Sequence, residues 1–337
     1  MKAIQITQTG SADILQYIDI DRPVAGPDQV LVKVEAIGVN YADVLVRQGA
    51  IPTAPFPVVP GEEYSGTIEA VGYNVTDYTP GQRVAVLLGH GPDSGHVSAG
   101  YAEYAVAEAS SVIPIPDAIG FDTAAAILAN YLTAYFLLHH SAHIKSGQSI
   151  LLHAAAGGGG TAMIQLAKLA GINVIGLTSS DGRVDYAKSQ GAMEVINYRN
   201  EDVYKSVMDI TNGCGVDVIF NSAGGNTLTR DFSLLAPFGQ IVWYGTAAGI
   251  PEVNLMQLLI DGFHEHKGIK TFLLHAMLQY KPEIWRQAAN TIIKYLVDGK
   301  IQPHVHKRFV LAEAARAHRL LETSQIYGKL ILTPKAN

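Results

Sequence analysis

The residues His153-Ala154-Ala155-Ala156-Gly157-Gly158-Gly159-Gly160 end an expected strand over residues 149–156 and lead into an expected helix over residues 162–170. Four glycines at such a junction leave backbone amides bare, at the positive end of a helix dipole. The spacing G-x-G-x-x-G is met with Ala155 in the first glycine position, followed by Gly157 and Gly160. The stretch therefore predicts a site for the pyrophosphate of a dinucleotide. A purely structural turn is the alternative.

Strands and helical segments alternate beyond this stretch. Strands are expected over residues 173–177, 194–198, 216–221 and 239–244, and a helix is expected over residues 183–190. Alternation at this spacing builds a doubly wound parallel sheet, and a glycine turn after its first strand is typical of dinucleotide binding. A late helix over residues 282–297 and a closing strand over residues 328–332 complete the pattern.

The first 120 residues have a different rhythm. Val30, Val32 and Val34 alternate with Leu31, Lys33 and Glu35, which predicts a strand with one dominant apolar face. Short apolar runs follow over residues 66–71, 83–88 and 102–106, with turn signals such as Pro60-Gly61 and Pro80-Gly81. Many short strands between Gly/Pro turns predict a β-barrel or sandwich.

Composition limits the class of protein. A chain of 337 residues predicts two domains at ~100–200 residues each. A hydrophobic share of 48% and a charged share of 16% exclude a disordered chain. The net charge of −6, without a basic block, argues against nucleic acid or an anionic membrane as the main partner. Cys214 is the single cysteine, which excludes a disulfide framework and a zinc site built on several cysteines.

Neither the N-terminal residues nor the longest apolar stretch suggests a secreted or membrane protein. The N-terminal residues turn polar by Gln5, so we expect no secretory signal. The longest apolar stretch, residues 124–138, contains Asn130 and Thr133 and is shorter than the ~20 residues of a membrane span. We expect a buried helix there, and a soluble, cytoplasmic protein.

Several motifs resemble one known family. They are Gly38-Val39-Asn40-Tyr41-Ala42-Asp43, Pro60-Gly61-Glu62-Glu63-Tyr64-Ser65-Gly66, the glycine-rich stretch, and Val195-Ile196-Asn197-Tyr198. Together they make the chain similar, over essentially its whole length, to the zinc-free quinone oxidoreductases (zeta-crystallin-like) of the medium-chain dehydrogenase/reductase superfamily. The residues Asn130-Tyr131-Leu132-Thr133-Ala134-Tyr135 are similar to the branch that contains the vesicle amine transport protein.

The resemblance implies an α/β protein with a particular domain order. A GroES-like β-barrel catalytic domain would span residues 1–124, and a doubly wound Rossmann NADP-binding domain residues 125–266. A C-terminal segment, residues 267–337, would return to the catalytic domain. The resemblance also implies a homodimer and an NADPH-dependent reduction.

Three positions depart from the family pattern. Gly159 stands where valine is usual, which would weaken the start of the helix by up to ~1 kcal/mol. Leu45 stands where quinone reductases often carry a tyrosine that faces the substrate, which puts simple quinones in doubt. The glycine-rich loop 89–100 is longer than usual and is a candidate rim of the substrate pocket.

The residues predict no metal site. Asn40 and Glu62 occupy the positions where zinc-dependent members of the superfamily carry the first cysteine and the histidine, and Cys214 lies in the nucleotide-binding half. The pair His139 and His143 has His140 where a metalloprotease motif needs glutamate. His304 and His306, which would share a strand face, lack an evident third ligand. Without a Lewis acid, reduction of a quinone or an activated C=C is favoured over alcohol oxidation.

Polar residues of two motifs are candidates for catalysis. Asn40 is the candidate for a hydrogen bond to the nicotinamide ribose or the substrate carbonyl, with a turn asparagine as the alternative. Tyr41 and Tyr131 each offer a phenolic proton, with core packing or a water proton donor as alternatives. The resemblance implies that Tyr131, with Asn130 and Thr133, lies in the segment that contacts nicotinamide.

The residues after the second strand predict NADPH over NADH. NAD-specific sites usually place Asp or Glu ~20 residues past the glycine turn, and this chain has Thr178-Ser179-Ser180 there. Arg183 and Tyr198 follow, at positions that the resemblance implies hold the 2′-phosphate; a solvated arginine and a packed tyrosine are the alternative. Asp181 would favour NADH if it turned inward. The residues expected to bind the cofactor are Asn40, Asn130, Thr133, Gly157, Gly158, Gly159, Gly160, Ser179, Arg183, Tyr198, Ala223, Tyr244, Gly245, Phe272, Leu273 and Lys329.

Two functions follow from these observations. The first is a zinc-independent, NADPH-dependent reductase of quinones or α,β-unsaturated carbonyls. The second is an NADPH-binding protein with little catalysis, in a structural or vesicle-associated role.

Overall fold

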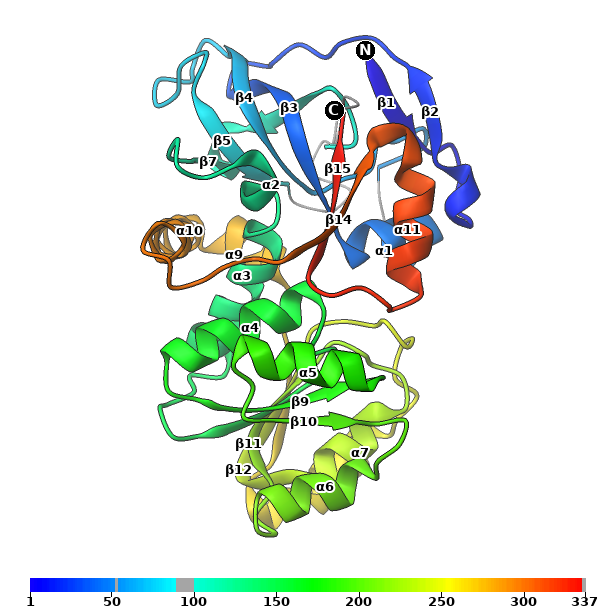
Figure 1. Cartoon of the computed structure of the whole chain (residues 1–337), viewed down its shortest axis with the longest axis vertical. Coiled ribbons are helices and arrows are strands. Elements are labelled where there is room, and N and C mark those ends of the chain that lie inside the picture. The colour runs from blue at the N-terminus through cyan, green and yellow to red at the C-terminus, as the bar shows by residue number, and fades with distance from the viewer. Residues whose placement is uncertain (52–53, 89–99, 335–337) are drawn as a thin grey trace. The chain divides into compact units, whose positions relative to one another are not determined.

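The structure is a computed structural model, and it describes residues 1–51, 54–88 and 100–334 (Figure 1). The chain divides into two compact units. Unit 1 contains Met1–Leu132 and His275–Asn337, and unit 2 contains Thr133–Leu274. The domain boundaries expected after residues 124 and 266 stay predictions.

Unit 1 is built on a seven-stranded sheet of order β14-β15-β3-β4-β5-β7, in which β6 also pairs with β3. Its strands are β3 (Gln29–Val39), β4 (Glu63–Val71), β5 (Arg83–Leu87), β6 (Tyr104–Glu108), β7 (Val112–Pro114), β14 (Val305–Val310) and β15 (Lys329–Thr333). A separate ribbon pairs β1 (Lys2–Gln5) with β2 (Gln16–Asp19). The helices are η1 (Ala12–Ile14), α1 (Tyr41–Gln48), η2 (Ala109–Ser111), α2 (Phe121–Ala124), α9 (Leu274–Tyr280), α10 (Pro282–Val297), η5 (Leu311–Glu313) and α11 (Ala314–Glu322). The short strands expected in the first 120 residues are thus present, together with helix α1, which the sequence did not predict.

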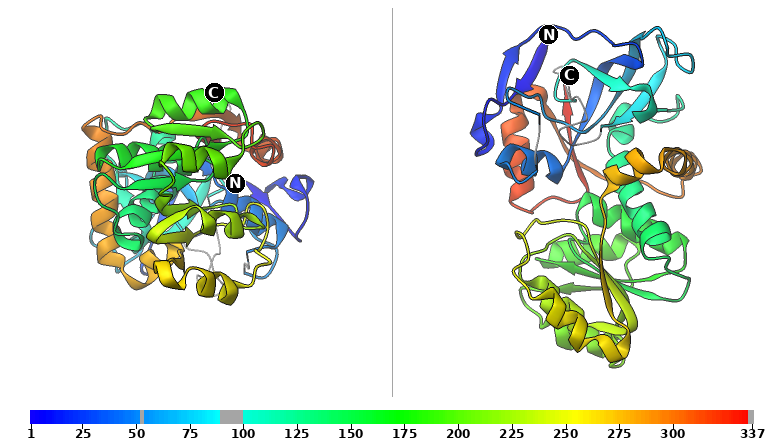
Figure 2. Two further views of the ribbon diagram at one scale, coloured as in Figure 1. Left: turned by 90° about the horizontal axis from the view of Figure 1, so that it is seen from below. Right: turned by 180° about the vertical axis from the view of Figure 1, so that it is seen from behind.

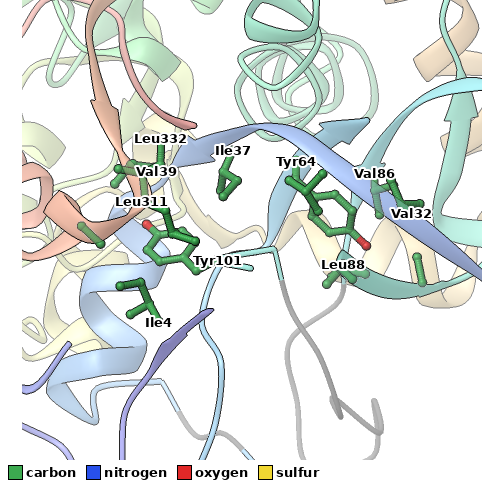
Figure 3. Close-up of a cluster of buried hydrophobic side chains, with 14 of the residues drawn as sticks. Ile4, Val32, Ile37, Val39, Tyr64, Val86, Leu88, Tyr101, Leu311 and Leu332 are labelled. Carbon is green, nitrogen blue, oxygen red and sulfur yellow. The ribbon is translucent and has the colours of Figure 1, made fainter. Parts of the chain in front are cut away.

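The core of unit 1 lies against β3. The dominant apolar face expected from the sequence is present, because Val30, Val32 and Val34 are buried while Lys33 and Glu35 are half-buried. Leu31, on the opposite face, is buried as well. Figure 3 shows Ile37 and Val39 of β3 together with Tyr64, Tyr101 and Leu332, residues that are far apart in the sequence. Burial of this cluster therefore joins the N-terminal strands to the last strand, β15.

Unit 2 contains a six-stranded sheet of order β10-β9-β8-β11-β12-β13, in which every neighbouring pair is parallel. The strands are β8 (Ser149–Leu152), β9 (Asn173–Thr178), β10 (Glu194–Asn197), β11 (Val216–Asn221), β12 (Leu235–Trp243) and β13 (Gly268–Thr271). The helices are η3 (Leu137–Ser141), α4 (Gly158–Leu169), α5 (Asp181–Gln190), α6 (Val203–Ile210), α7 (Thr227–Ser233), α8 (Leu255–Asp261) and η4 (Phe263–Glu265). Helices α4 and α5 cover one face of the sheet, and α6 and α7 cover the other (Figure 1). The predicted doubly wound parallel sheet is confirmed.

The strand order reverses between β8 and β11. From β8 the chain builds outward through β9 to β10, and it then returns to place β11 on the other side of β8. In open α/β sheets, ligands bind outside the carboxyl ends of the strands at such a point. The glycine turn follows β8 and therefore lies at this place.

Helix α4 begins earlier than the sequence predicts. The strand β8 ends at Leu152, and Gly158, Gly159 and Gly160 form the first turn of α4 after the N-cap Gly157. Glycine lowers helix stability by ~1 kcal/mol per residue, which is why the pattern alone placed the helix start at residue 162. A Cβ on Gly160 would lie 2.4 Å from the carbonyl oxygen of Ala154, which explains why glycine is required inside the helix.

The apolar stretch before β8 forms helix α3 (Leu128–Phe136), which begins in unit 1 and ends in unit 2. The run Phe121–Ser141 is long and apolar enough to cross a membrane by length and composition, with a mean hydropathy of 1.3. However, 67% of that window is buried inside the protein, as in the core helix of a globular protein. This agrees with the buried helix expected from the sequence.

Candidate active site

The predicted cofactor residues of unit 2 follow the carboxyl ends of the strands. All six parallel strands contribute, so that these positions share one edge of the sheet. They are Gly157, Gly158, Gly159 and Gly160 after β8; Ser179 and Arg183 after β9; Tyr198 after β10; Ala223 after β11; Tyr244 and Gly245 after β12; and Phe272 and Leu273 after β13.

The glycine turn has the geometry of an anion site. The N–H of Gly157 donates to the carbonyl of Ala154 at 3.0 Å, and Ala154 has φ = 53°. The next amides, those of Gly158 to Gly160, stand in the first helical turn and have no intrahelical acceptor. A Cβ on Gly160 would lie 2.4 Å from the carbonyl oxygen of Ala154, while a Cβ on Gly159 would meet nothing within 4 Å. The turn thus presents bare amides to open space, which fits a pyrophosphate.

Residues after β9 and β10 form a second polar group. Nη1 of Arg183 donates to Oγ of Ser179 at 3.2 Å, which brings these two predicted residues together. The side chain of Tyr198 is exposed. Asp181 is engaged elsewhere, because its Oδ1 accepts a hydrogen bond of 2.7 Å from the amide of Asn197.

The turns after β11, β12 and β13 are held by the backbone. The N–H of Tyr244 donates to the carbonyl of Asn221 at 2.9 Å, and that of Phe272 to Trp243 at 3.0 Å. Burial raises the pKa of Tyr244 to about 12, with a hydrogen bond to Ser222 acting in the opposite direction. A Cβ on Gly245 would lie 2.6 Å from the carbonyl oxygen of Ser222, so only glycine fits there. The side chain of Leu273 is 63% exposed.

Unit 1 brings Asn40 and Lys329 together around a residue that the sequence did not single out. Nζ of Lys329 lies 2.7 Å from Oε2 of Glu63 and also donates to Oδ1 of Asn40. The amide of Asn40 donates to the same Glu63 oxygen at 3.1 Å, and Oε1 of Glu63 accepts from the N–H of Ala129 at 2.9 Å. All three side chains are buried. The arrangement requires Gly38, because a Cβ there would lie 2.8 Å from Oε2 of Glu63.

This network limits what Asn40 can do. Its amide oxygen already accepts from Lys329, and its amide nitrogen already donates to Glu63. The ammonium of Lys329 has three protons, and the hydrogen bonds described for it use two. Lys329 therefore keeps one donor for a ligand, whereas Asn40 is largely committed to holding Lys329.

A second buried network begins at the backbone N–H of Asn40. Asp43 accepts from the N–H of Asn40 at 2.9 Å and from the hydroxyl of Tyr101 at 3.2 Å, and that hydroxyl lies 2.9 Å from Nε2 of His318. Burial, followed by the charge of Arg47, lowers the pKa of His318 to about 3, so this histidine is neutral. The network fixes the start of α1 and with it Asn40.

The remaining candidates lie on α1 and α3. Tyr41 is half-buried, and burial, followed by the charge of Glu322, raises the pKa of its phenol. Tyr131 is only 1% exposed, which favours its core-packing alternative. Asn130 and Thr133 are half-buried. The roles of these four residues stay predictions.

Leu45 and the loop 89–100 are two of the three departures from the family pattern. Leu45 is half-buried on α1. The predicted pocket rim is the loop 89–100, and residues 89–99 of it lie outside the described residues. A cavity of about 430 Å³ in unit 1 is lined by residues such as Arg47, Arg319 and Glu322, and none of the predicted site residues line it.

In the part of the chain that the structure describes, no group of three or more His, Cys, Asp or Glu side chains could hold a metal ion. Glu62 faces His275, whose Nε2 lies 3.3 Å from its Oε2. His143 adopts φ = 51° beyond η3 and so leaves the helical spacing with His139. Nδ1 of His306 accepts from the N–H of Tyr327.

Glu63, which joins Asn40 and Lys329, was quoted only as part of the motif Pro60–Gly66 and was not predicted as a site residue. Glu63 begins β4 and is fully buried, and a buried charge needs a partner. The identity of the partner depends on the fold, since Glu63 and Lys329 are 266 residues apart.

Comparisons with known proteins agree with this architecture. The family described as "Alcohol dehydrogenase GroES-like domain" matches residues 26–117, and that described as "Zinc-binding dehydrogenase" matches residues 158–292. A quinone oxidoreductase of Pseudomonas aeruginosa is 34% identical over 99% of both chains. A 2-haloacrylate reductase of a Burkholderia species is 32% identical over 99% of both chains. The crystal structure of Escherichia coli quinone oxidoreductase complexed with NADPH matches with a TM-score of 0.92 and 29% identity, over 99% of this chain and 100% of the other.

A GroES-like domain joined to a Rossmann-type sheet with a glycine turn after its first strand defines a medium-chain dehydrogenase/reductase. This confirms the fold class expected from the sequence. The chain belongs to the quinone oxidoreductase family of that superfamily, and it is an oxidoreductase.

Proposed function

We propose that the protein is a zinc-independent, NADPH-dependent reductase of quinones or α,β-unsaturated carbonyls. The observation that carries the proposal is the set of predicted cofactor residues at the carboxyl ends of six parallel strands, with the glycine turn at the reversal of strand order. The kinship with quinone oxidoreductases and with a 2-haloacrylate reductase supports reduction of an electron-poor double bond.

The residues of unit 2 fit NADPH. The amides of Gly158, Gly159 and Gly160 would hold the pyrophosphate at the helix start. Arg183 and Ser179 would hold the 2′-phosphate, since a guanidinium makes charge-assisted hydrogen bonds to phosphate oxygens. When bound, NADPH supplies the hydride. The protein contributes binding, orientation and exclusion of water.

The residues of unit 1 would provide polar donors. Lys329 has one proton not used by Asn40 or Glu63 and would donate it to an oxygen of the cofactor. Tyr41, with its half-buried phenol, is the proposed donor of the proton that completes the reduction; a water molecule is the alternative.

The zinc independence rests on the ligand types. Asn40 is tied to Glu63 and Lys329, and Glu62 lies beside His275, so the positions that zinc would need offer no thiolate. Metal analysis of protein purified without an affinity tag should give far less than one zinc per chain. One tightly held zinc per chain would overturn this part of the proposal.

The reductase activity has a direct test. Purified protein is incubated with NADPH and a panel of quinones and enones, and the loss of NADPH absorbance is followed against a reaction without substrate. We expect turnover near the ~10 per second of a median enzyme. Tight NADPH binding without turnover of any panel member would favour the alternative, a structural or vesicle-associated NADPH-binding protein.

We also propose a cytoplasmic homodimer. Strand β13 is one of the two edge strands of the parallel sheet in the described residues, and an unpaired edge invites association with a second copy. Helix α8, which runs along the outside of unit 2 (Figure 2), has no buried residue and exposes Met256 and Ile260. Residues 239–243 of the predicted stretch 239–244 belong to β12, next to that edge.

Light scattering tests the assembly. For the wild type we expect about twice the 36.1 kDa mass of one chain. For Ile260→Glu, which places a charge on the exposed apolar face of α8, we expect a shift toward the mass of a single chain. A wild type that is monomeric at micromolar concentration would contradict the homodimer. Fractionation of cells tests the location.

A further inference from the structure

The carboxylate of Asp231, on α7, is fully buried and accepts hydrogen bonds from three side chains. Its Oδ2 lies 2.7 Å from Nε2 of His153 and accepts from Nδ2 of Asn221 at 2.6 Å. Its Oδ1 accepts from Nε and Nη2 of Arg230 at 3.2 and 2.7 Å. Burial acts to raise the pKa of this carboxyl, but His153 and Arg230 outweigh burial, so its pKa is lowered and it is ionised at neutral pH. An ionised carboxylate only accepts, so His153 is the donor in its hydrogen bond.

His153 is the residue from which the glycine turn starts. Its own N–H donates to the carbonyl of Phe220 in β11 at 3.2 Å. The next residue, Ala154, has φ = 53°, and its carbonyl accepts from Gly157. A residue other than glycine keeps such a conformation only where its surroundings fix it. The hydrogen bond from His153 to Asp231 supplies one of those constraints.

Asn221 holds the neighbouring turn in the same way. Its Oδ1 accepts from the N–H groups of Ala223 and Gly224 at 2.9 and 2.8 Å. Gly224 and Gly225 both have positive φ, at 67° and 53°, which glycine adopts without strain; the two hydrogen bonds to Asn221 therefore select this turn among the many conformations open to glycine. Ala223 is one of the residues predicted to bind the cofactor.

These two turns follow neighbouring strands. β8 and β11 pair in parallel, and the reversal of strand order lies between them. One carboxylate oxygen, Oδ2 of Asp231, thus receives a donor from each turn at the place where a dinucleotide binds.

We propose that Asp231 is a positioning residue of the dinucleotide site, which couples the glycine turn to the turn after β11 through His153 and Asn221. The inference rests on the proposed function, because it requires that the cofactor bind at this edge. Preorganised turns bind a ligand without the loss of freedom that ordering them would cost. The proposal therefore predicts that loss of this coupling weakens cofactor binding beyond any general loss of stability.

The chain offers a matched control at the opposite end of the same two strands. Asp217, in β11, accepts from the N–H and the hydroxyl of Ser149 in β8 at 2.7 and 3.1 Å, and from Gln148 at 3.0 Å. Like Asp231, it connects β11 to β8, but it does so at the amino ends of the strands, away from the predicted cofactor edge. Asp217→Asn thus reports the cost of losing a carboxylate between these strands without touching the site.

The experiment measures the Kd for NADPH by fluorescence titration and the stability by urea unfolding, for wild type, Asp231→Asn and Asp217→Asn. We expect Asp231→Asn to raise the NADPH Kd on the order of 10- to 100-fold, as displaced binding groups do. Asp217→Asn should lose stability and keep the wild-type Kd. Wild-type affinity in Asp231→Asn, or equal loss of affinity in both variants, would overturn the proposal. Failure of the wild type to bind NADPH would instead overturn the proposed function, and the inference with it.

A second pair keeps the test decisive if Asp231→Asn does not fold. In His153→Gln the new amide can donate to Asp231, whereas in His153→Leu no donor remains. We expect His153→Gln to retain most of the NADPH affinity and His153→Leu to lose it. Equal affinities in the two variants would show that the hydrogen bond to Asp231 does not position the turn.

Discussion

Nζ of Lys329, at the start of the last strand, lies 2.7 Å from Oε2 of Glu63, at the start of β4, and both side chains are buried. The two strands are not neighbours, because β3 runs between them. The ion pair therefore ties the C-terminal segment to the strands from the first part of the chain. It also holds Asn40, whose amide contacts both charged groups.

Removal of one partner of this pair should be costly. Glu63→Gln leaves the ammonium of Lys329 buried without a counter-charge, so we expect a loss of about 3–5 kcal/mol in the free energy of unfolding. The measurement is urea unfolding at neutral pH. In the double variant Glu63→Gln/Lys329→Met no charge is left behind, and part of the loss should return.

The matched control is the exposed pair Lys188 and Glu194, at 2.9 Å. Glu194→Gln should cost less than about 1 kcal/mol, since exposed ion pairs are screened by water. A similar cost for Glu63→Gln and Glu194→Gln would contradict the importance of the buried pair.

Two adjacent glycines of the first turn of α4 should respond in opposite ways. A Cβ on Gly160 would lie 2.4 and 2.5 Å from the backbone oxygens of Ala154 and Ala155, which cannot move without opening the turn. Gly160→Ala should therefore destabilise the protein and abolish NADPH binding. A Cβ on Gly159 meets nothing within 4 Å, so Gly159→Ala should raise stability by up to about 1 kcal/mol through helix propensity. Thermal unfolding and NADPH titration of the two variants check this; equal behaviour would refute the contact argument.

The buried histidine His318 should make stability depend on pH. Its pKa is lowered to about 3, first by burial and then by Arg47, whereas a histidine in the unfolded chain has a pKa near ~6.5. Between these values the unfolded chain binds a proton that the folded protein does not bind. The contribution of His318 to the free energy of unfolding is therefore fully present above the unfolded pKa of ~6.5. Below that pH the free energy of unfolding falls by up to about 1.4 kcal/mol per pH unit, until the folded pKa of about 3 is reached.

Urea unfolding of wild type and His318→Gln at several pH values checks this slope. The variant keeps a donor toward Tyr101 but does not titrate, so its stability should fall less steeply between neutral pH and ~4. His264→Gln, at an exposed histidine, should keep the wild-type slope. Identical slopes for wild type and His318→Gln would show that His318 is protonated in the folded protein.

Local periodicity was enough to predict much of the fold. The helix α10 and the strand β11 have the bounds expected from the sequence, because each combines a clear apolar pattern with a proline or glycine nearby. The start of α4 was misplaced, since the glycine of the first turn is set by a tertiary contact rather than by helix propensity. The same limit applies to the site. The glycine turn is contiguous in sequence and could be identified, whereas the pair His153 and Asp231, 78 residues apart, exists only once the parallel sheet is formed.

The preference for NADPH over NADH should depend on Arg183. Its Nη1 lies 3.2 Å from Oγ of Ser179, at the carboxyl end of β9, where the 2′-phosphate is expected. The acidic residue that could have favoured NADH, Asp181, has its Oδ1 occupied by the amide of Asn197 at 2.7 Å. Loss of a phosphate contact worth ~1.5–3 kcal/mol in Arg183→Ala should raise the KM for NADPH by about 10- to 100-fold and leave the KM for NADH nearly unchanged. Steady-state kinetics with both cofactors measure this, with Arg316→Ala, at an exposed arginine of unit 1, as the control. Equal use of NADPH and NADH by the wild type, or a parallel change in both KM values, would contradict the assignment of Arg183 to the 2′-phosphate.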